Sequence, residues 1–264
     1  MWLNFQNQSQ WYKNCYFTLI LHLITTIIYN LRYFIFIIWF FIAGITLNAQ
    51  FNKDSTYAYQ DLNKILELAR TNNDQKTLAE VYIKLADYEG DVFAEFEKSF
   101  EYYRRALEYF KVTRDSNGVF ETNHSIAKRY TDAGFYEESI NLLQNLVIIY
   151  SRNKKISKLA NVYFDLNRAY KLKGENELSI EYLKKAEDLN KTLKDTVLLT
   201  KILFDKIQTF ELNFDLDSAL TTAFTVFNIN TESENQEMAA KSLFHIGYIN
   251  KLQNDLPKAI KYLS

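Results

Sequence analysis

Histidine, cysteine and paired acidic side chains are the groups best able to hold a metal ion, and in this chain they are few and scattered. The 264 residues include three histidines, His22, His124 and His245, and one cysteine, Cys15. No histidine lies three or four positions from another histidine or from the cysteine, as two metal ligands on one helix face would. A single cysteine can form no internal disulfide. We therefore expect no metal site, no cofactor and no disulfide framework.

The acidic pair Asp215-x-Asp217 superficially resembles the start of a calcium-binding loop. The loop glycine and the terminal glutamate that complete such a loop are missing. A helix that begins with Asp217 as its N-cap explains the pattern better. The sequence also contains no phosphate-binding glycine loop, no nucleophile elbow and no carboxylate pair at a distinctive spacing. We therefore expect no catalytic residues, and the chain is not predicted to be an enzyme.

The charge and composition of the chain bear on nucleic-acid binding and on the fold class. The chain has 31 Lys and Arg against 32 Asp and Glu, a formal net charge of −1. No segment concentrates basic residues in the way that tracks a phosphate backbone, so we do not expect nucleic-acid binding. One proline and six glycines are too few for the turns of an all-β fold. The composition therefore favours an all-α fold.

Small residues recur along the chain at a fixed interval of forty positions. They are Ser99, Ser139, Ser179, Ala219 and Ala259, each followed by an apolar residue. A constant period of this length is typical of solenoids built from stacked helical hairpins. Because a small side chain lets two helices approach closely, we expect these five residues at helix–helix contacts.

The third repeat shows the helical pattern most clearly. Apolar residues fall three and four positions apart between Ser157 and Lys173, as on one face of a helix. Gly174 then suits the left-handed turn that ends a helix. A second helix follows, with Ser179 and Ala186 seven positions apart on one face. Each repeat is therefore expected to be an antiparallel pair of helices.

These motifs resemble the tetratricopeptide repeat (TPR), a helix–turn–helix unit of about 34 residues. The matching positions in the third repeat are Tyr163, Leu166, Asn167, Tyr170, Gly174, Ser179, Leu183 and Ala186. The resemblance implies an all-α, TPR-like superhelical solenoid of antiparallel helix pairs over residues 55–264. We expect a partial leading hairpin at 55–70 and units at about 78–117, 118–157, 158–197, 198–237 and 238–264, the last one incomplete.

Three departures from the family pattern lead to further expectations. The period is longer by about six residues, which predicts second helices extended by more than a turn. The spacing of aromatic residues in the first unit predicts an insertion in a turn near Gly90. In the fourth unit Phe214 stands where the turn glycine is expected.

The first fifty residues have a different composition. The chain is almost uncharged and strongly apolar from Cys15 to Leu47. Arg32, the apolar run after it and the small Ala49 predict a signal peptide over residues 31–49. Residues 1–30 fit this poorly, and we interpret them as an apolar upstream segment that precedes the true start. The alternative is one uncleaved anchor over residues 16–47, and both interpretations predict export.

The other end of the sequence favours a larger assembly. Ser264 falls within the second helix of the fifth unit, whereas a solenoid needs a closing helix with a polar outer face. We therefore expect a longer protein, or another chain packed on this edge. With the signal peptide, the chain resembles the exported repeat domain of bacterial TPR-containing sensor histidine kinases and regulators. That resemblance implies an extracytoplasmic sensory part at the periplasmic face of the inner membrane. The alternative is a periplasmic or membrane-tethered assembly scaffold with no signalling output.

The concave face of a TPR solenoid is lined by the first helix of each hairpin, and it is the surface left for a protein or peptide partner. Spacing places eight candidate binding residues on that face: His124, Lys128, Asn161, Phe164, Arg168, Lys171, Lys201 and Phe204. Arginine can hold a carboxylate through two hydrogen bonds, and an aromatic ring adds buried area. The set predicts a groove for an extended peptide of acidic character. The alternative is an inner face that is merely solvated.

Overall fold

A computed structural model describes residues 59–233 and 235–263 of the chain. The predicted signal peptide, the alternative anchor and the upstream segment lie outside these residues. The chain divides into two compact units, residues 1–67 and 68–264. Residues 59–71 are helical, and the description below concerns the second unit.

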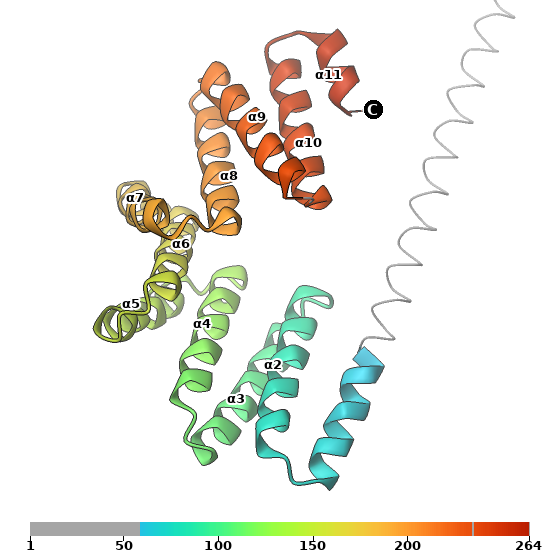
Figure 1. Cartoon of the computed structure of the whole chain (residues 1–264), viewed down its shortest axis with the longest axis vertical. Coiled ribbons are helices and arrows are strands. Elements are labelled where there is room, and N and C mark those ends of the chain that lie inside the picture. The colour runs from blue at the N-terminus through green and yellow to red at the C-terminus, as the bar shows by residue number, and fades with distance from the viewer. Residues whose placement is uncertain (1–58, 234, 264) are drawn as a thin grey trace, which may run out of the picture. The chain divides into compact units, whose positions relative to one another are not determined.

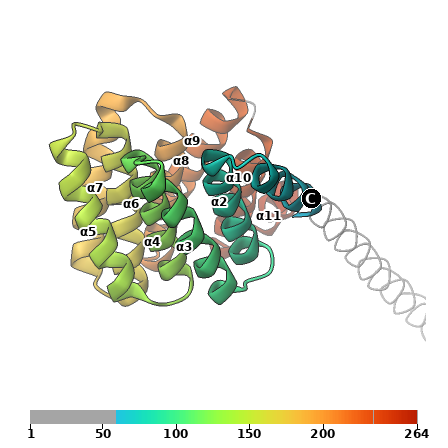
Figure 2. The same cartoon turned by 90° about the horizontal axis from the view of Figure 1, so that it is seen from below.

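The described part of the second unit is built from helices joined by short turns, with no strand among its residues. In chain order the helices are α2 (Gln75–Asp91), α3 (Phe96–Val112), α4 (Ser116–Asp132), α5 (Tyr136–Arg152), α6 (Ile156–Lys173), α7 (Asn176–Leu193), α8 (Thr196–Leu212), α9 (Leu216–Glu232), α10 (Gln236–Leu252) and α11 (Leu256–Leu263). Neighbouring helices in this order pack on each other. In Figure 2 the helices α5, α6 and α7 run side by side. The predicted all-α solenoid of helix pairs is confirmed.

Turns with the same backbone conformation recur every twenty residues and explain why the helices are evenly spaced along the chain. A residue with positive φ stands at positions 94, 114, 134, 154, 174, 194, 214 and 254. The left-handed residue reverses the chain and is followed by the residue that precedes the next helix. Only Gly134 and Gly174 at these positions are glycines, so most of the turns carry the strain of a side chain in this conformation. The forty-residue period is therefore two equal half-repeats of twenty.

The evenly spaced small residues lie where the two helices of a hairpin touch. All five are buried, and three of them are serines that also bind the opposite helix. Ser99 Oγ donates to the carbonyl oxygen of Ala86 at 2.7 Å, and Ser179 Oγ donates to Asn167 Oδ1 at 2.7 Å. The predicted contact role of these residues is confirmed.

The structure corrects three of the expectations about helix lengths and turns. Both helices of the complete pairs have 17 or 18 residues, so the longer period is shared equally and not added to the second helix. Gly90 lies inside α2 and not in a turn, but the connection that follows the helix has four residues where later connections have two or three. A side chain at Gly90 would overlap the guanidinium group of Arg129. The helix α9 is capped by Asp215, which accepts from the backbone N–H of Ser218 at 3.3 Å, and not by Asp217.

Candidate functional site: the inner face

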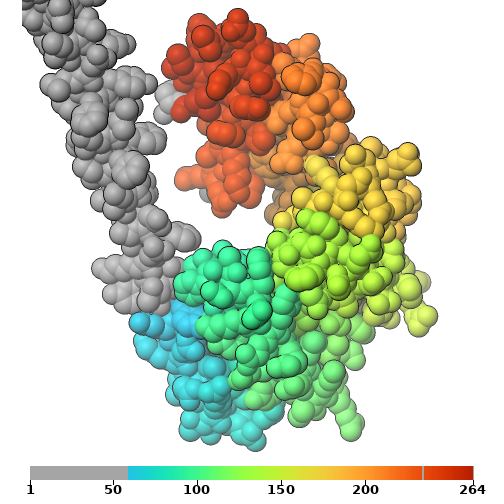
Figure 3. Space-filling view, turned by 180° about the vertical axis from the view of Figure 1, so that it is seen from behind, coloured from blue at the N-terminus to red at the C-terminus, as the bar shows by residue number. Residues whose placement is uncertain are grey.

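The first helices of the hairpins line two adjoining hollows on one face of the second unit. A hollow of about 340 Å³ is lined by residues of α2, α4, α6 and α8, and one of about 710 Å³ by residues of α4, α6, α8 and α10. Lys128, Asp165 and Lys201 line both. In Figure 1 these even-numbered helices lie on the inner side of the curve of the repeats. The space-filling view in Figure 3 shows the surface hollowed between the green part and the orange and red part. We call this surface the inner face.

The structure brings all eight candidate binding residues together on the inner face. His124, Lys128 and Asn161 line the smaller hollow, and Phe164, Arg168, Lys171, Lys201 and Phe204 line the larger one. That they bind a peptide stays a prediction. Sequence reasoning missed other lining residues, among them Asp165, Asp205, Met238, Lys241, Phe244 and His245. A repeat alignment could have found Phe244, because it lies forty positions after Phe204.

Hydrogen-bonded pairs of side chains join each first helix to the next one along the inner face. His124 Nε2 of α4 lies 2.7 Å from Asp165 Oδ2 of α6, and Lys171 Nζ of α6 lies 2.9 Å from Asp205 Oδ1 of α8. His245 Nδ1 of α10 lies 2.9 Å from Glu211 Oε1 of α8. Because these side chains are largely buried, the pairs fix how neighbouring hairpins meet.

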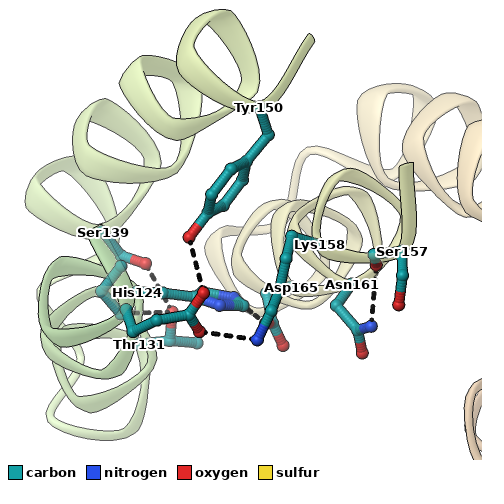
Figure 4. Close-up of polar contacts among 10 residues, drawn as sticks. His124, Thr131, Ser139, Tyr150, Ser157, Lys158, Asn161 and Asp165 are labelled. Carbon is teal, nitrogen blue, oxygen red and sulfur yellow. Dashed lines mark hydrogen bonds and ion pairs between the residues drawn. The ribbon is translucent and has the colours of Figure 1, made fainter. Parts of the chain in front are cut away.

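Figure 4 shows the polar contacts of residues that line the smaller hollow, among them His124, Lys158 and Asn161. Lys158 Nζ donates to Glu121 Oε2 at 2.8 Å, and the Tyr150 hydroxyl donates to Glu121 Oε1 at 3.3 Å. Burial, followed by the negative charge of Glu121, raises the pKa of Tyr150 above its ordinary value. The tyrosine therefore stays a neutral donor at physiological pH. Asn161 turns its amide back to the carbonyl oxygen of Ser157 at 3.0 Å.

The pairing changes the roles expected of three basic candidates. Arg168 donates to Asp132 at 2.6 Å, Lys171 holds Asp205, and His124 holds Asp165. Each is therefore already matched with a carboxylate of its own chain. Sequence reasoning placed these residues on the correct face but did not foresee their acidic partners on neighbouring first helices.

Lys128 and Lys201 differ from the other basic residues of the inner face. Both are exposed, and neither makes a hydrogen bond or ion pair with any residue between 59 and 263 that the structure describes. Both line both hollows. They are therefore the cations on the inner face that remain available to a partner.

Aromatic side chains form a stripe along the larger hollow. Phe164, Phe204 and Phe244 come from α6, α8 and α10 at intervals of forty residues and all line it. The His245 ring lies 5.6 Å from the Phe204 ring and 5.9 Å from the Phe244 ring, measured between centroids. Phe244 is 59% exposed. The stripe offers apolar area that a bound chain could cover.

A charged cluster lies at the N-terminal end of the inner face. The buried Arg129 of α4 reaches Asp91 of α2 at 2.6 Å and Asp132 at 3.5 Å. Asp87 of α2 accepts a hydrogen bond from the Tyr103 hydroxyl. Burial raises the pKa of Asp87, and burial next to that carboxylate raises the pKa of Tyr103. The helix glycine Gly90 gives the Arg129 guanidinium its space.

The described residues offer neither a metal site nor a membrane-spanning helix. Residues 59–233 and 235–263 contain no cluster of three or more histidine, cysteine or acidic side chains placed to hold a metal ion. None of the helices in those ranges combines the length and apolar character that crossing a membrane requires.

Comparison with known proteins gives the fold of the chain. No family model and no curated protein sequence matches it. Among solved structures, it is similar to BtubC (BKLC) from P. vanneervenii, with a TM-score of 0.60 and 17% identity over 79% of this chain and 88% of that one. It is similar to a Rap protein complexed with Competence and Sporulation Factor, with a TM-score of 0.63 and 16% identity over 76% of this chain and 56% of that one. It also resembles the TPR-like repeats of a putative kinesin light chain from Podosopora anserina, with a TM-score of 0.52 and 14% identity over 70% and 90%. The chain has a TPR-like fold.

Proposed function

We propose that the chain is a protein-binding repeat scaffold whose inner face holds an extended peptide with apolar and acidic side chains. The observation that carries the proposal is the stripe of Phe164, Phe204 and Phe244 beside the unpaired Lys128 and Lys201. Apolar surface of this kind, edged by charge, is typical of peptide-recognition grooves. The TPR-like fold supports a scaffold, and no catalytic role is proposed.

The aromatic stripe supplies the affinity in this proposal. The three rings stand on successive first helices and line the same hollow. A peptide lying along this hollow in an extended conformation would pass the three rings in turn, with its side chains pointing alternately toward and away from them. Burying an aromatic ring against apolar side chains contributes about 1–2 kcal/mol at an interface.

The two unpaired lysines supply the preference for acidic residues. Arg168 and Lys171 are neutralised by carboxylates of the same chain, and His124 is hydrogen-bonded to Asp165. These three residues therefore add little net attraction. Lys128 and Lys201 lie where the two hollows meet. A carboxylate of the peptide at that point would face two cations at once, and exposed charges of this kind also steer association.

The experiment uses a displayed library of random twelve-residue peptides, selected on the full chain. We expect the enriched peptides to carry at least two aromatic or aliphatic residues and at least one Asp or Glu. Phe204→Ala should then weaken a selected peptide about tenfold, and Lys201→Glu should weaken the acidic peptides by a similar factor. Fluorescence anisotropy measures both.

Matched variants on other surfaces test whether the loss of affinity is specific to the inner face or follows from removing any exposed ring or reversing any charge. Phe214→Ala removes an aromatic ring that is 78% exposed in the turn before α9, and Lys184→Glu reverses a charge on α7. Both should leave the affinity unchanged. If Phe204→Ala and Lys201→Glu behaved like these two controls, the inner face would not be the binding surface.

We further propose that the repeats work outside the cytoplasm as the sensory part of a bacterial signalling protein. The support is the predicted signal peptide at residues 31–49. An alkaline phosphatase fused after residue 264 should be active in an enteric bacterium, and N-terminal sequencing of the exported product should begin at Gln50. An inactive fusion would contradict export. Export without any change in a downstream regulator on peptide binding would favour the assembly scaffold instead.

A further inference from the structure

The junction between α7 and α8 is packed less closely than the preceding hairpin junctions. At those junctions the residue after the small residue packs against a residue thirty positions later. The Phe100 and Tyr130 rings lie 4.6 Å apart, and Ile140 and Tyr170 belong to one buried cluster. The equivalent residues are Ile180 and Phe210. Ile180 is 62% exposed, whereas Ile140 is 4% exposed.

A cavity of about 450 Å³ occupies this junction. Its apolar wall comes from Ile180 and Leu183 of α7 and from Phe210 and Leu212 of α8. The helices α7 and α8 have the sparsest contact of the four junctions between described hairpins. Figure 1 shows α7 nearly end-on and α8 along its length, so the two helices are strongly inclined. The volume is within the range of small-molecule sites.

One buried polar group in the wall of this cavity has an unused donor. Asn167 is fully buried and lines the cavity. Its Oδ1 accepts from Ser179 Oγ at 2.7 Å, but its Nδ2 has no hydrogen-bond partner. Leaving a buried amide N–H unpaired costs about 1–3 kcal/mol. The other repeats have Ala127, Ile207 and Gly247 at this position, so the amide belongs to this junction alone among them.

The charged groups around the cavity are matched with each other. Lys206 Nζ lies 2.7 Å from Glu187 Oε1, and Lys171 Nζ lies 2.9 Å from Asp205 Oδ1. The Lys171–Asp205 pair also lines the larger hollow of the inner face, so it stands between the two spaces. Because the rim is balanced in charge, it favours an uncharged ligand over an ion.

We propose that this cavity binds an uncharged apolar molecule of medium size that carries one hydrogen-bond acceptor, such as a ketone or an ester. The alkyl part lies against Ile180, Leu183 and Phe210. The carbonyl oxygen accepts from Asn167 Nδ2, after a small side-chain movement that exposes the amide. The ligand thereby covers the apolar area left open between the two hairpins and pairs the unused donor.

The test titrates 2-octanone into the full chain and follows the isoleucine and leucine methyl signals by NMR. We expect saturable shifts at Ile180, Leu183 and Leu212. Asn167→Ala should bind 2-octanone about two- to tenfold more weakly than the parent, the contribution of one neutral hydrogen bond. Methyl signals that do not respond to 2-octanone would overturn the proposal.

A matched pair of variants separates the cavity from apolar surface elsewhere. Ile180→Trp places a bulky ring at the cavity and should abolish the saturable shifts. Ile260→Trp makes the same change at the same repeat position in α11, where the isoleucine is 69% exposed and lines no part of this cavity, and should bind like the parent. Equal binding by both variants would contradict the site. Far-ultraviolet circular dichroism confirms that each variant is folded.

Discussion

The junctions α5–α6 and α7–α8 occupy the same place in consecutive repeats, yet one is closed and the other open. At the first, Ile140 and Tyr170 join a continuous buried cluster that also includes Leu143 and Leu166. At the second, Ile180 is exposed and a cavity lies beside it. Repeat position alone therefore does not determine burial, because burial also depends on how far the next hairpin is inclined.

The difference has an energetic consequence for the whole solenoid. Stability of a repeat protein is approximately the sum of each repeat's own stability and of the interfaces between neighbours. A junction with little buried apolar area contributes little interface stability. We therefore expect hairpins α4–α5 and α6–α7 to unfold together, and the α7–α8 junction to be the place where cooperativity is weakest.

The largest expected effect comes from truncating the same residue in both junctions. Ile140→Ala should lower the free energy of unfolding by about 2–4 kcal/mol, because it removes buried methylene groups and leaves a void. Ile180→Ala should lower it by less than about 1 kcal/mol, since the side chain is already in contact with water. Urea unfolding followed by circular dichroism measures both. Equal losses would show that the two junctions are energetically alike.

A second comparison concerns the close approach of α3 and α4. A methyl group added at Gly118 would overlap the ring of the buried Phe110. Gly118→Ala should therefore cost about 1–3 kcal/mol through overpacking. Lys158 holds the same position one repeat later and is exposed, so Lys158→Ala should cost at most about 1 kcal/mol through its surface ion pair. A neutral Gly118→Ala would mean that the ring moves freely.

Much of the fold could be predicted from the sequence, because each hairpin repeats the same local pattern. The small residues at forty-residue intervals and the stripe in α6 identified the helix pairs and their contact faces. The lengths of the second helices were predicted wrongly. The turn within a hairpin and the turn between hairpins are twenty residues apart, but among these turns only those at Gly134 and Gly174 contain a glycine. The sequence therefore showed the forty-residue period but not its division into two equal halves.

The candidate site was predictable as a face but not as a set of charges. Helical spacing placed Arg168 and Lys171 on the inner face, where they lie. Their acidic partners come from other repeats, Asp132 from α4 and Asp205 from α8. Which carboxylate reaches which base depends on the angle between hairpins, and no single-helix pattern contains that angle. The unpaired state of Lys128 and Lys201 could not be predicted for the same reason.

A smaller effect is expected at two equivalent turns that have the same backbone conformation but different residues. Phe214 adopts φ of 56° and is 78% exposed, whereas Gly134 adopts φ of 85° with open space around it. Phe214→Gly should raise the free energy of unfolding by about 0.5–1 kcal/mol, as strain is relieved and partly offset by backbone entropy. Gly134→Ala should lower it by about 1 kcal/mol. Thermal unfolding measures both, and changes of the same sign would contradict the strain argument.

The smallest effect concerns Asp87, which belongs to the charged cluster that joins α2, α3 and α4. This cluster contrasts with the α7–α8 junction, which contains a cavity. Burial raises the pKa of this carboxyl above its ordinary 3.8, so the folded state binds its proton more tightly than the unfolded state does. Above the raised pKa the group is ionised in both states, and its burial opposes folding. As the pH falls through that pKa towards 3.8, the folded state takes up the proton and the penalty disappears.

The variant Asp87→Asn tests this argument, because it keeps an oxygen that accepts from the Tyr103 hydroxyl. It should therefore stabilise the chain at pH 7 by less than about 1 kcal/mol, since water screens a half-buried group, and the gain should vanish near pH 4. A loss of stability at pH 7 that shrank on acidification would show that Asp87 is held as an anion by Arg129 instead.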